Sequence, residues 1–255
     1  MSQWRVIIDD AADGPWNMAV DRAILSEHAS GDAPPTLRLY GFSPPTVSIG
    51  RFQKLDDVDV PYCHERGIDV CRRPTGGRGV LHDEELTYSI VAGVRDGVPR
   101  GVRDSYRYLS GALAAAYRSL GVDAALTARE RGKRVGACYL HATGADLSLG
   151  AAKLSGSAQV WERDSCLQHG SFVIARDVAR EARVFMLDVE AARALATSTA
   201  TIVDAIGRRP EHVELATAVR TGVEATFAVE LCEEGLSDGE QMLARSYVSE
   251  YRLDA

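Results

Sequence analysis

The apolar and polar positions of the chain alternate between short strand-like runs and longer helical ones. Period-two alternation and β-forming residues predict strands over residues 4–8, 36–40, 46–49, 68–71, 86–92, 145–149, 155–161 and 167–174. Apolar residues recur at helical spacing over residues 102–120, and Gly121 is a typical residue to end that helix. Further helices are expected over residues 16–30, 56–66, 211–227 and 237–251.

This order of elements predicts an α+β fold. Strands and helices mix without strict β-α-β alternation, which favours mixed β-sheets flanked by helices. No internal repeat, low-complexity segment or Pro/Gly/Ser-rich linker divides the 255 residues. We therefore expect one domain over residues 1–255, with a small helical C-terminal portion from about residue 208 packed on it.

The composition is that of a globular protein, with 45% hydrophobic and 25% charged residues, which excludes a disordered chain. No apolar run reaches the roughly 18–20 residues that a membrane helix needs, and the N-terminus has no signal-peptide pattern. The five cysteines form no CxxC motif and no zinc-binding spacing with histidine. We expect a cytoplasmic protein with reduced thiols, no metal and no membrane partner.

The formal net charge of −7 argues against a nucleic-acid partner. The charge is uneven, because residues 95–134 hold nine basic side chains against four acidic ones, whereas residues 177–255 hold fifteen acids against eight arginines. A solvated surface explains such a bias, and so does a docking face for an acidic partner; the pattern alone leaves both open.

A glycine-rich segment, RRPTGGRGVLHDEELTYS over residues 72–89, is the most informative part of the chain. It matches neither the P-loop nor the dinucleotide-binding motif. Gly76 and Gly77 let main-chain N–H groups approach a ligand closely, and Arg72, Arg73 and Arg78 add positive charge. Such a loop can hold a phosphate or a carbonyl oxygen that gains negative charge, or it can be a tight turn with solvent-facing arginines.

The same segment resembles the signature of the lipoate–protein ligase and octanoyltransferase family, which has the biotin/lipoate-ligase catalytic fold. Further blocks of the chain are similar to the family in the same order, over residues 17–19, 37–40, 48–53, 153–159 and 168–171. The resemblance implies that fold for nearly the whole chain. It also implies a catalytic domain, and a length of 255 residues leaves little room for the accessory domain of many ligases.

The resemblance implies a set of site residues. The implied acyl site takes its residues from the glycine loop and from the two later blocks. These residues are Arg73, Thr75, Gly76, Gly77, His82, Gly156, Ala158 and His169. Lys153 corresponds to the active-site lysine of the family. From the residues alone, a lone lysine is usually at the surface, and a histidine in an apolar strand is usually a core residue.

Cys138 lies in Gly-Ala-Cys-Tyr, fifteen residues before Lys153, and resembles the catalytic cysteine of the ligase-like octanoyltransferases of Gram-positive bacteria. Without the resemblance, an inert buried thiol is the ordinary interpretation. With it, Cys138 and Lys153 are the implied catalytic pair, since a neighbouring ammonium lowers the pKa of a thiol and so makes the nucleophilic thiolate.

The function that follows is octanoyl transfer from acyl carrier protein to a lysine of a lipoyl-type domain, such as the glycine-cleavage H protein, through a cysteine thioester and without a cofactor. Three alternatives stay open. They are an ATP- and magnesium-dependent lipoate–protein ligase, an amidotransferase between carrier domains, and a non-catalytic acyl- or carrier-binding protein. Because both kinds of carrier are typically acidic, we expect residues 95–134 to form the docking face of a monomeric enzyme.

Overall fold

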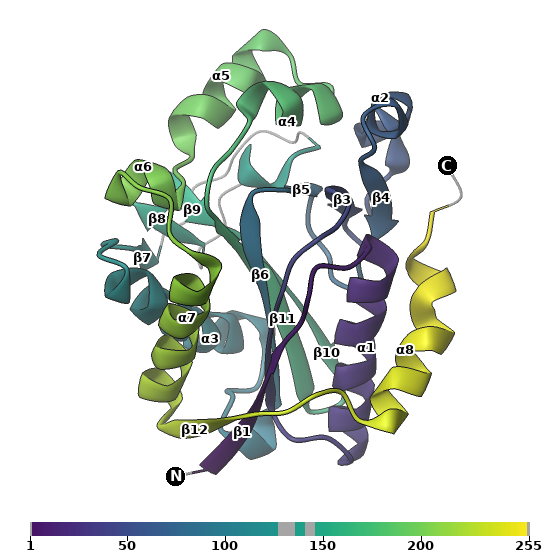
Figure 1. Ribbon diagram of the computed structural model, residues 1–255, viewed down its shortest axis with the longest axis vertical. Coiled ribbons are helices and arrows are strands. Elements are labelled where there is room, and N and C mark those ends of the chain that lie inside the picture. The colour runs from purple at the N-terminus through teal and green to yellow at the C-terminus, as the bar shows by residue number, and fades with distance from the viewer. Residues whose placement is uncertain (1, 127–135, 141–145, 254–255) are drawn as a thin grey trace.

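The computed structural model describes residues 2–126, 136–140 and 146–253. A six-stranded mixed sheet runs through the molecule in the order β10-β11-β6-β2-β1-β12 (Figure 1). Its strands are β1 (Ser2–Ile8), β2 (Thr36–Tyr40), β6 (Glu85–Gly93), β10 (Ser157–Glu162), β11 (Ser165–Val173) and β12 (Val229–Glu233). Strand β1 pairs in parallel with β2 and β12, and the other neighbours are antiparallel.

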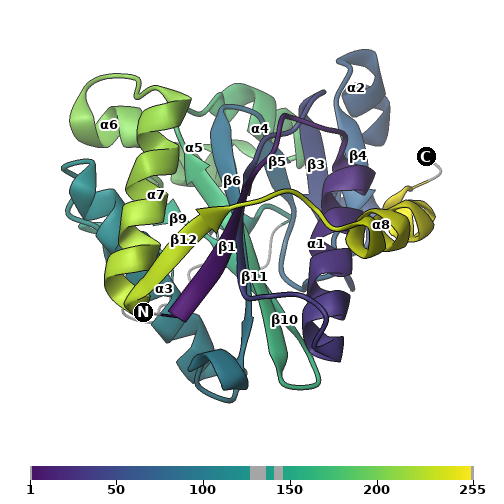
Figure 2. The ribbon, with the colours of Figure 1, turned by 60° about the horizontal axis from the view of Figure 1, so that its bottom comes forward.

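Two pairs of helices cover the two faces of this sheet (Figure 2). Helices α1 (Gly14–Ser30) and α8 (Asp238–Tyr251) pack on one face, and α3 (Val102–Ser119) and α7 (His212–Phe227) pack on the other. The alternation along β6 explains both cores, because Tyr88 and Ile90 join the cluster of α3 and α7, whereas Val91 joins that of α1. All nine residues of β6 are buried, as expected of a strand covered on both faces.

Two three-stranded sheets flank the main one. The first consists of β4 (Asp69–Arg72), β3 (Thr46–Ile49) and β5 (Val80–His82), and the second of β7 (Ala125–Leu126), β8 (Leu147–Leu149) and β9 (Ala152–Ser155). The shorter helices are α2 (Val60–Glu65), α4 (Val178–Val184), α5 (Val189–Ser198), α6 (Ile202–Ile206) and the 3₁₀ turns η1 (Leu55–Asp57), η2 (Val94–Asp96) and η3 (Cys138–Leu140). The glycine loop joins β4 to β5 in the first small sheet.

Helix α1 begins and ends where its sequence dictates. The side chain of Asp13 accepts a hydrogen bond from the Trp16 amide over 2.7 Å, and Pro15 occupies the first turn, where no N–H partner is needed. Gly31, with φ at +96°, ends the helix in the left-handed conformation. The helix thereby holds Met18 and Asp21 buried against the main sheet.

The structure confirms the α+β fold and most of the predicted elements, and adds the short strands β5 and β7, which were not predicted. The helix expected over residues 56–66 is divided into η1 and α2, because Asp59 caps a new helix in front of Pro61. Gly156 separates β9 from β10 inside the strand expected over 155–161. The C-terminal segment contains α7 and α8 but also β12, which was not predicted and which extends the main sheet beside β1.

In the described ranges, no helix combines the length and the apolar character needed to cross a bilayer.

Candidate active site

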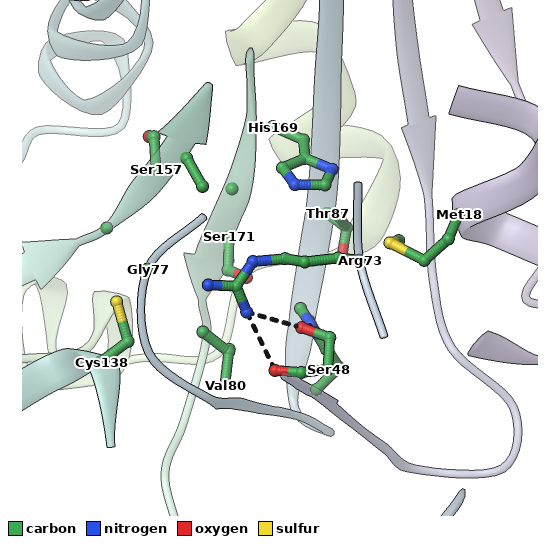
Figure 3. A pocket seen from close by; sticks show the side chains of 14 residues that line it. Met18, Ser48, Arg73, Gly77, Val80, Thr87, Cys138, Ser157, His169 and Ser171 are labelled. Carbon is green, nitrogen blue, oxygen red and sulfur yellow. Dashed lines mark hydrogen bonds between the residues drawn. The ribbon is translucent and has the colours of Figure 1, made fainter. Parts of the chain in front are cut away.

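A pocket of about 450 Å³, with the open solvent at its mouth included, lies between the glycine loop and strands β6, β10 and β11 (Figure 3). The residues lining it are Met18, Ser48, Arg73, Gly77, Val80, His82, Thr87, Cys138, Gly156, Ser157, Ala158, His169, Gly170 and Ser171. The pocket therefore combines a thiol and a guanidinium with small side chains that leave space for a ligand.

Arg73 is buried in the wall of this pocket rather than turned to solvent, with 4% of its side chain exposed. Its guanidinium donates to the carbonyl oxygens of Ser48, Gly76 and Arg78 over 2.7–2.9 Å, so the glycine loop folds around it. Gly77 has φ at +96°, and a Cβ there would lie 2.8 Å from Nη2 of Arg73. Burial lowers the pKa of Arg73, but an arginine stays charged at neutral pH.

Cys138 reaches the pocket from η3. Its main-chain N–H donates to the carbonyl of Gly79 over 2.8 Å, and the Gly79 N–H donates to the carbonyl of Gly136 over 3.0 Å. Gly156 faces the thiol, since a Cβ at this position would lie 3.5 Å from Sγ of Cys138 and 3.3 Å from Nζ of Lys153. The absence of a side chain at Gly156 thus lets the thiol and the ammonium approach the same point.

Lys153 on β9 is held beside Cys138 by a carboxylate. Its Nζ lies 3.0 Å from Oδ2 of Asp146, and both side chains are at least nine-tenths buried. The same Nζ donates to the main-chain carbonyl of Cys138 over 3.2 Å and lies 5.6 Å from the centroid of the Tyr139 ring. A buried lysine in this position can polarise a carbonyl bound next to the thiol.

The other cysteines lie outside the pocket. Cys63, Cys71 and Cys166 are buried, and burial raises the pKa of Cys63 to about 11 and that of Cys71 to about 12. Cys232 on β12 is partly exposed, and all five thiols are free. Cys138 is thus the one cysteine that lines the pocket.

Two buried histidines complete the wall, and each lies between a carboxylate and a hydroxyl. Nδ1 of His169 lies 3.0 Å from Oδ2 of Asp21, and its Nε2 lies 2.7 Å from Oγ1 of Thr75. Nδ1 of His82 lies 2.6 Å from Oε1 of Glu85, and its Nε2 lies 2.8 Å from Oγ of Ser48.

Burial lowers the pKa of His169, outweighing the opposite effect of Asp21. Burial also raises the pKa of a carboxyl group, but the hydrogen bond from His169 and the charge of Arg38 bring the pKa of Asp21 below its usual value. Hydrogen bonds from His82 and Thr87 lower the pKa of Glu85 in the same way. The two acids are therefore carboxylates, and His169 is neutral at neutral pH.

Comparisons with known proteins agree with this geometry. Residues 13–223 match the model of the lipoyl protein ligase A/B catalytic domain. The chain belongs to this family. It is 38% identical to the octanoyltransferase LipM of Moorella thermoacetica over 93% of this chain and 91% of that protein. It is 34% identical to the LipM of Clostridioides difficile over 99% and 97% of the two chains.

Solved structures of the family share the fold. A lipoate-protein ligase A bound with ATP superposes with a TM-score of 0.81 at 25% identity, covering 98% of this chain and 95% of that one. A bipartite lipoate protein ligase of Thermoplasma acidophilum, studied with its E2 lipoyl domain, also gives 0.81, at 24% identity over 98% and 93% of the chains. The fold is thus common to both activities, and the match to curated octanoyltransferases assigns the enzyme class: the chain is an octanoyltransferase, a type of acyltransferase.

The structure of this lipoyl protein ligase family member brings most of the predicted site residues together. Seven line the pocket: Arg73, Gly77, His82, Cys138, Gly156, Ala158 and His169. Three stand behind or beside the lining: Thr75 bonds to His169, the carbonyl of Gly76 accepts from Arg73, and Lys153 adjoins Cys138. Their roles in substrate binding and catalysis stay predictions.

Sequence reasoning missed the acids of the site, Asp21, Glu85 and Asp146, although the structure places each against a predicted site residue. Asp21 and Glu85 stand within buried runs of α1 and β6, and an acid on an apolar face is the one signal that could have found them. Met18 and Ser48 lie in blocks of family resemblance that carried no assigned role.

Proposed function

We propose that this enzyme moves an octanoyl group from acyl carrier protein to a lysine of a lipoyl-type domain, such as the glycine-cleavage H protein, through a thioester on Cys138, as a step of lipoate biosynthesis. The position of Cys138 carries the proposal, because it is the one cysteine of the pocket and adjoins a buried lysine. Arg73, Thr75, Gly76, Gly77, His82, Gly156, Ala158 and His169 form the acyl site in this proposal.

In the first step, the Cys138 thiolate attacks the carbonyl carbon of the carrier's octanoyl thioester. A new carbon–sulfur bond forms, the bond to the carrier's sulfur breaks, and that sulfur leaves as a thiolate that takes up a proton. The ammonium of Lys153 and the guanidinium of Arg73 are the two cations of the site. They stabilise the attacking thiolate and then the tetrahedral oxyanion. One thioester replaces another, so the step is nearly isoenergetic.

In the second step, the neutral amine of the acceptor lysine attacks the thioester on Cys138. A carbon–nitrogen bond forms, the carbon–sulfur bond breaks, and the amine proton returns to the thiolate or to solvent. The product is an amide, which is more stable than a thioester, so transfer runs in one direction. Glycines at positions 77, 156 and 170 keep the wall free of side chains along the path of the acyl group.

Neither step consumes ATP, and no cofactor is part of this proposal. The main alternative is an ATP- and magnesium-dependent lipoate–protein ligase, favoured by the similarity in fold to a ligase bound with ATP. In the part of the chain that the structure describes, no three His, Cys, Asp or Glu side chains gather as metal ligands. A cytoplasmic location belongs to the proposal, because a cysteine nucleophile must stay reduced.

The carriers are proposed to dock on a monomer at helix α3, next to the pocket. Arg103 and Arg107 are exposed on this helix. Tyr106, between them, donates to the carbonyl of Ser157 in the pocket wall over 2.7 Å, which places these arginines near the path of a carrier's substrate. Lys133 and the other basic residues at 129–134 lie outside the described residues.

The proposal is tested with purified octanoyl carrier protein and apo H protein in the absence of ATP. We expect the wild type to octanoylate the H protein, Cys138→Ser to be inactive, and Cys232→Ser, the matched control, to keep full activity. Strict dependence on ATP and a free acid, with Cys138→Ser unaffected, would identify a ligase. Transfer from octanoyl-H protein but not from the carrier protein would identify an amidotransferase.

A further inference from the structure

We propose that two carboxylate–imidazole–hydroxyl relays, Asp21–His169–Thr75 and Glu85–His82–Ser48, converge on Arg73 and fix its guanidinium in the pocket wall. Asp21 and Glu85 thereby act as positioning residues of this enzyme. The consequence for turnover rests on the function proposed above, whereas the relays themselves are a property of the folded protein.

Arg73 lacks a direct counterion. Its guanidinium contacts the carbonyls of Ser48, Gly76 and Arg78 and the hydroxyls of Ser48 and Thr75, and no carboxylate contacts it within the described part of the chain. A buried charge that is not paired is costly, so a compensating negative charge is expected nearby. The hydroxyls of Thr75 and Ser48, which contact Arg73, are each connected through a histidine to such a charge.

The direction of the hydrogen bonds at both ends of each relay follows from the chemistry of the end groups. Arg73 can only donate, so Oγ1 of Thr75, 3.1 Å from Nε, and Oγ of Ser48, 3.3 Å from Nη1, both accept from it. A carboxylate can only accept, so Nδ1 of each histidine carries a proton, which it donates to Asp21 or Glu85. Both acids have lowered pKa values, which agrees with carboxylates at the accepting end of each relay.

The middle of each relay follows from where the hydroxyl protons of Thr75 and Ser48 can go. In the described part of the chain, the acceptors that contact these hydroxyls are Nε2 of His169 and Nε2 of His82, over 2.7 and 2.8 Å, so we assign both Nε2 atoms as unprotonated. Both imidazoles are thus neutral Nδ1–H tautomers. Neither has a ring nitrogen left to bind a substrate, and the two histidines act through Arg73 rather than on the acyl group.

Arg73 connects these relays to the thiol. Nη2 of Arg73 donates to the main-chain carbonyl of Arg78. The carbonyl of Gly79, the residue after Arg78, accepts from the main-chain N–H of Cys138 over 2.8 Å. Rotation of the guanidinium would therefore release the glycine loop that holds Cys138. Figure 3 shows Arg73 bonded to Ser48 in the wall of the pocket that also contains His169 and Cys138.

The Glu85 relay is the better one to test. Asp21 is also the counterion of the buried Arg38, 2.9 Å away, so its loss disturbs the core. Glu85 accepts from His82 and from Thr87, over 2.6 and 2.7 Å, and makes no ion pair with lysine or arginine in the described residues. Glu85→Gln keeps an oxygen that accepts from His82 and Thr87 but removes the negative charge, so the relay keeps its hydrogen bonds and loses its anion.

The test is nitrogen NMR of the histidine rings combined with steady-state kinetics of the intact enzyme. We expect Nδ1–H tautomers for His82 and His169 in the wild type, and the same tautomers in Glu85→Gln, which removes the charge of the acid and not its accepting oxygen. We also expect kcat to fall roughly 10- to 100-fold with KM for the carrier changed less than twofold. Asp83→Asn, which removes a neighbouring acid paired with Arg180, is the control and should change neither the histidine tautomers nor kcat.

A second variant, Ser48→Ala, removes the hydroxyl and leaves the His82–Glu85 pair intact. We expect His82 to keep the Nδ1–H tautomer in this variant, and kcat to fall about as much as in Glu85→Gln. Nε2–H or doubly protonated rings in the wild type would overturn the relays, whatever the enzyme catalyses. Wild-type kcat in both variants would overturn the positioning role. Failure of the function proposed above is recognised separately, since it alters the wild-type reaction and not the tautomers.

Discussion

The main-chain N–H of Cys138 donates to the carbonyl oxygen of Gly79 over 2.8 Å, which joins the cysteine segment to the glycine loop. The two segments are 59 positions apart in the chain. Their contact places the thiol in the same pocket wall as Arg73, so the glycine loop supports the segment of the proposed nucleophile and also forms part of the pocket wall.

The pair of Lys153 and Asp146 predicts that the carboxylate is needed as well as the lysine. Lys153→Met should lower kcat at least 100-fold, since the cation beside the thiol is lost. Asp146→Asn removes the carboxylate that lies 3.0 Å from the buried ammonium, and we expect it to lower both kcat and the free energy of unfolding, the latter by about 3 kcal/mol. Transfer rates and urea unfolding measure these effects.

The control is Lys54→Met, which removes an exposed lysine and should change neither quantity. Wild-type kcat in Lys153→Met would show that the ammonium has no part in the reaction.

Gly77 is predicted to matter for activity beyond its backbone conformation. Gly77 and Gly67 both have positive φ, at +96° and +62°, but a Cβ at Gly77 would lie 2.8 Å from Arg73, whereas one at Gly67 would have open space. Gly67→Ala should cost about 1 kcal/mol of unfolding free energy and leave kcat unchanged. Gly77→Ala should lower the unfolding free energy by more than Gly67→Ala does, and should lower kcat at least tenfold. Equal effects of the two substitutions on kcat would refute the role given to Arg73.

The buried titratable groups predict that stability falls in two stages on acidification. The pKa of His169 is lowered by burial, so below about pH 6.5 the unfolded chain binds a proton that the folded chain does not. The pKa values of Asp21 and Glu85 are lowered too, so their stabilisation is present above about pH 4 and is lost as the pH falls through their folded values.

Urea unfolding between pH 8 and pH 3 measures both stages. His169→Gln should flatten the first stage, and His64→Gln, at an exposed position, should not. A wild type that gains stability between pH 6.5 and pH 5 would be inconsistent with a neutral buried His169.

Much of the fold follows from local patterns. The bounds of β2 and β3 agree with the sequence prediction, and α1 is set by Asp13, Pro15 and Gly31, all within its own segment. The missed strand β12 forms because it pairs in parallel with β1, more than 220 positions away, and no local pattern reports such a partner.

The same distinction applies to the site. The residues carried by motifs, such as Arg73 and His169, were found, because each motif is contiguous in the chain. Asp21 was missed because its role exists only through a contact with His169, 148 positions later. Glu85 is close to His82 in the chain, but a carboxylate three residues from a histidine is too common a pattern to indicate a relay.

The exposed arginines of α3 predict a docking face for acidic carriers. Arg103→Glu/Arg107→Glu should raise KM for the carrier protein at least fivefold and weaken its dependence on salt, with kcat little changed. Arg193→Glu/Arg245→Glu makes the same change in net charge at exposed positions on α5 and α8 and serves as the control. Equal KM values for the two double variants would place the docking face elsewhere.

The proposed thioester on Cys138 is tested most directly by the mass of the enzyme after incubation with octanoyl carrier protein alone, without ATP or acceptor. The account predicts one octanoyl group on the peptide that contains Cys138, none on Cys232 or in Cys138→Ala, and release of the group when apo H protein is added. An enzyme that octanoylates the H protein at full rate while Cys138 stays unmodified, or while Cys138→Ala stays active, would contradict it.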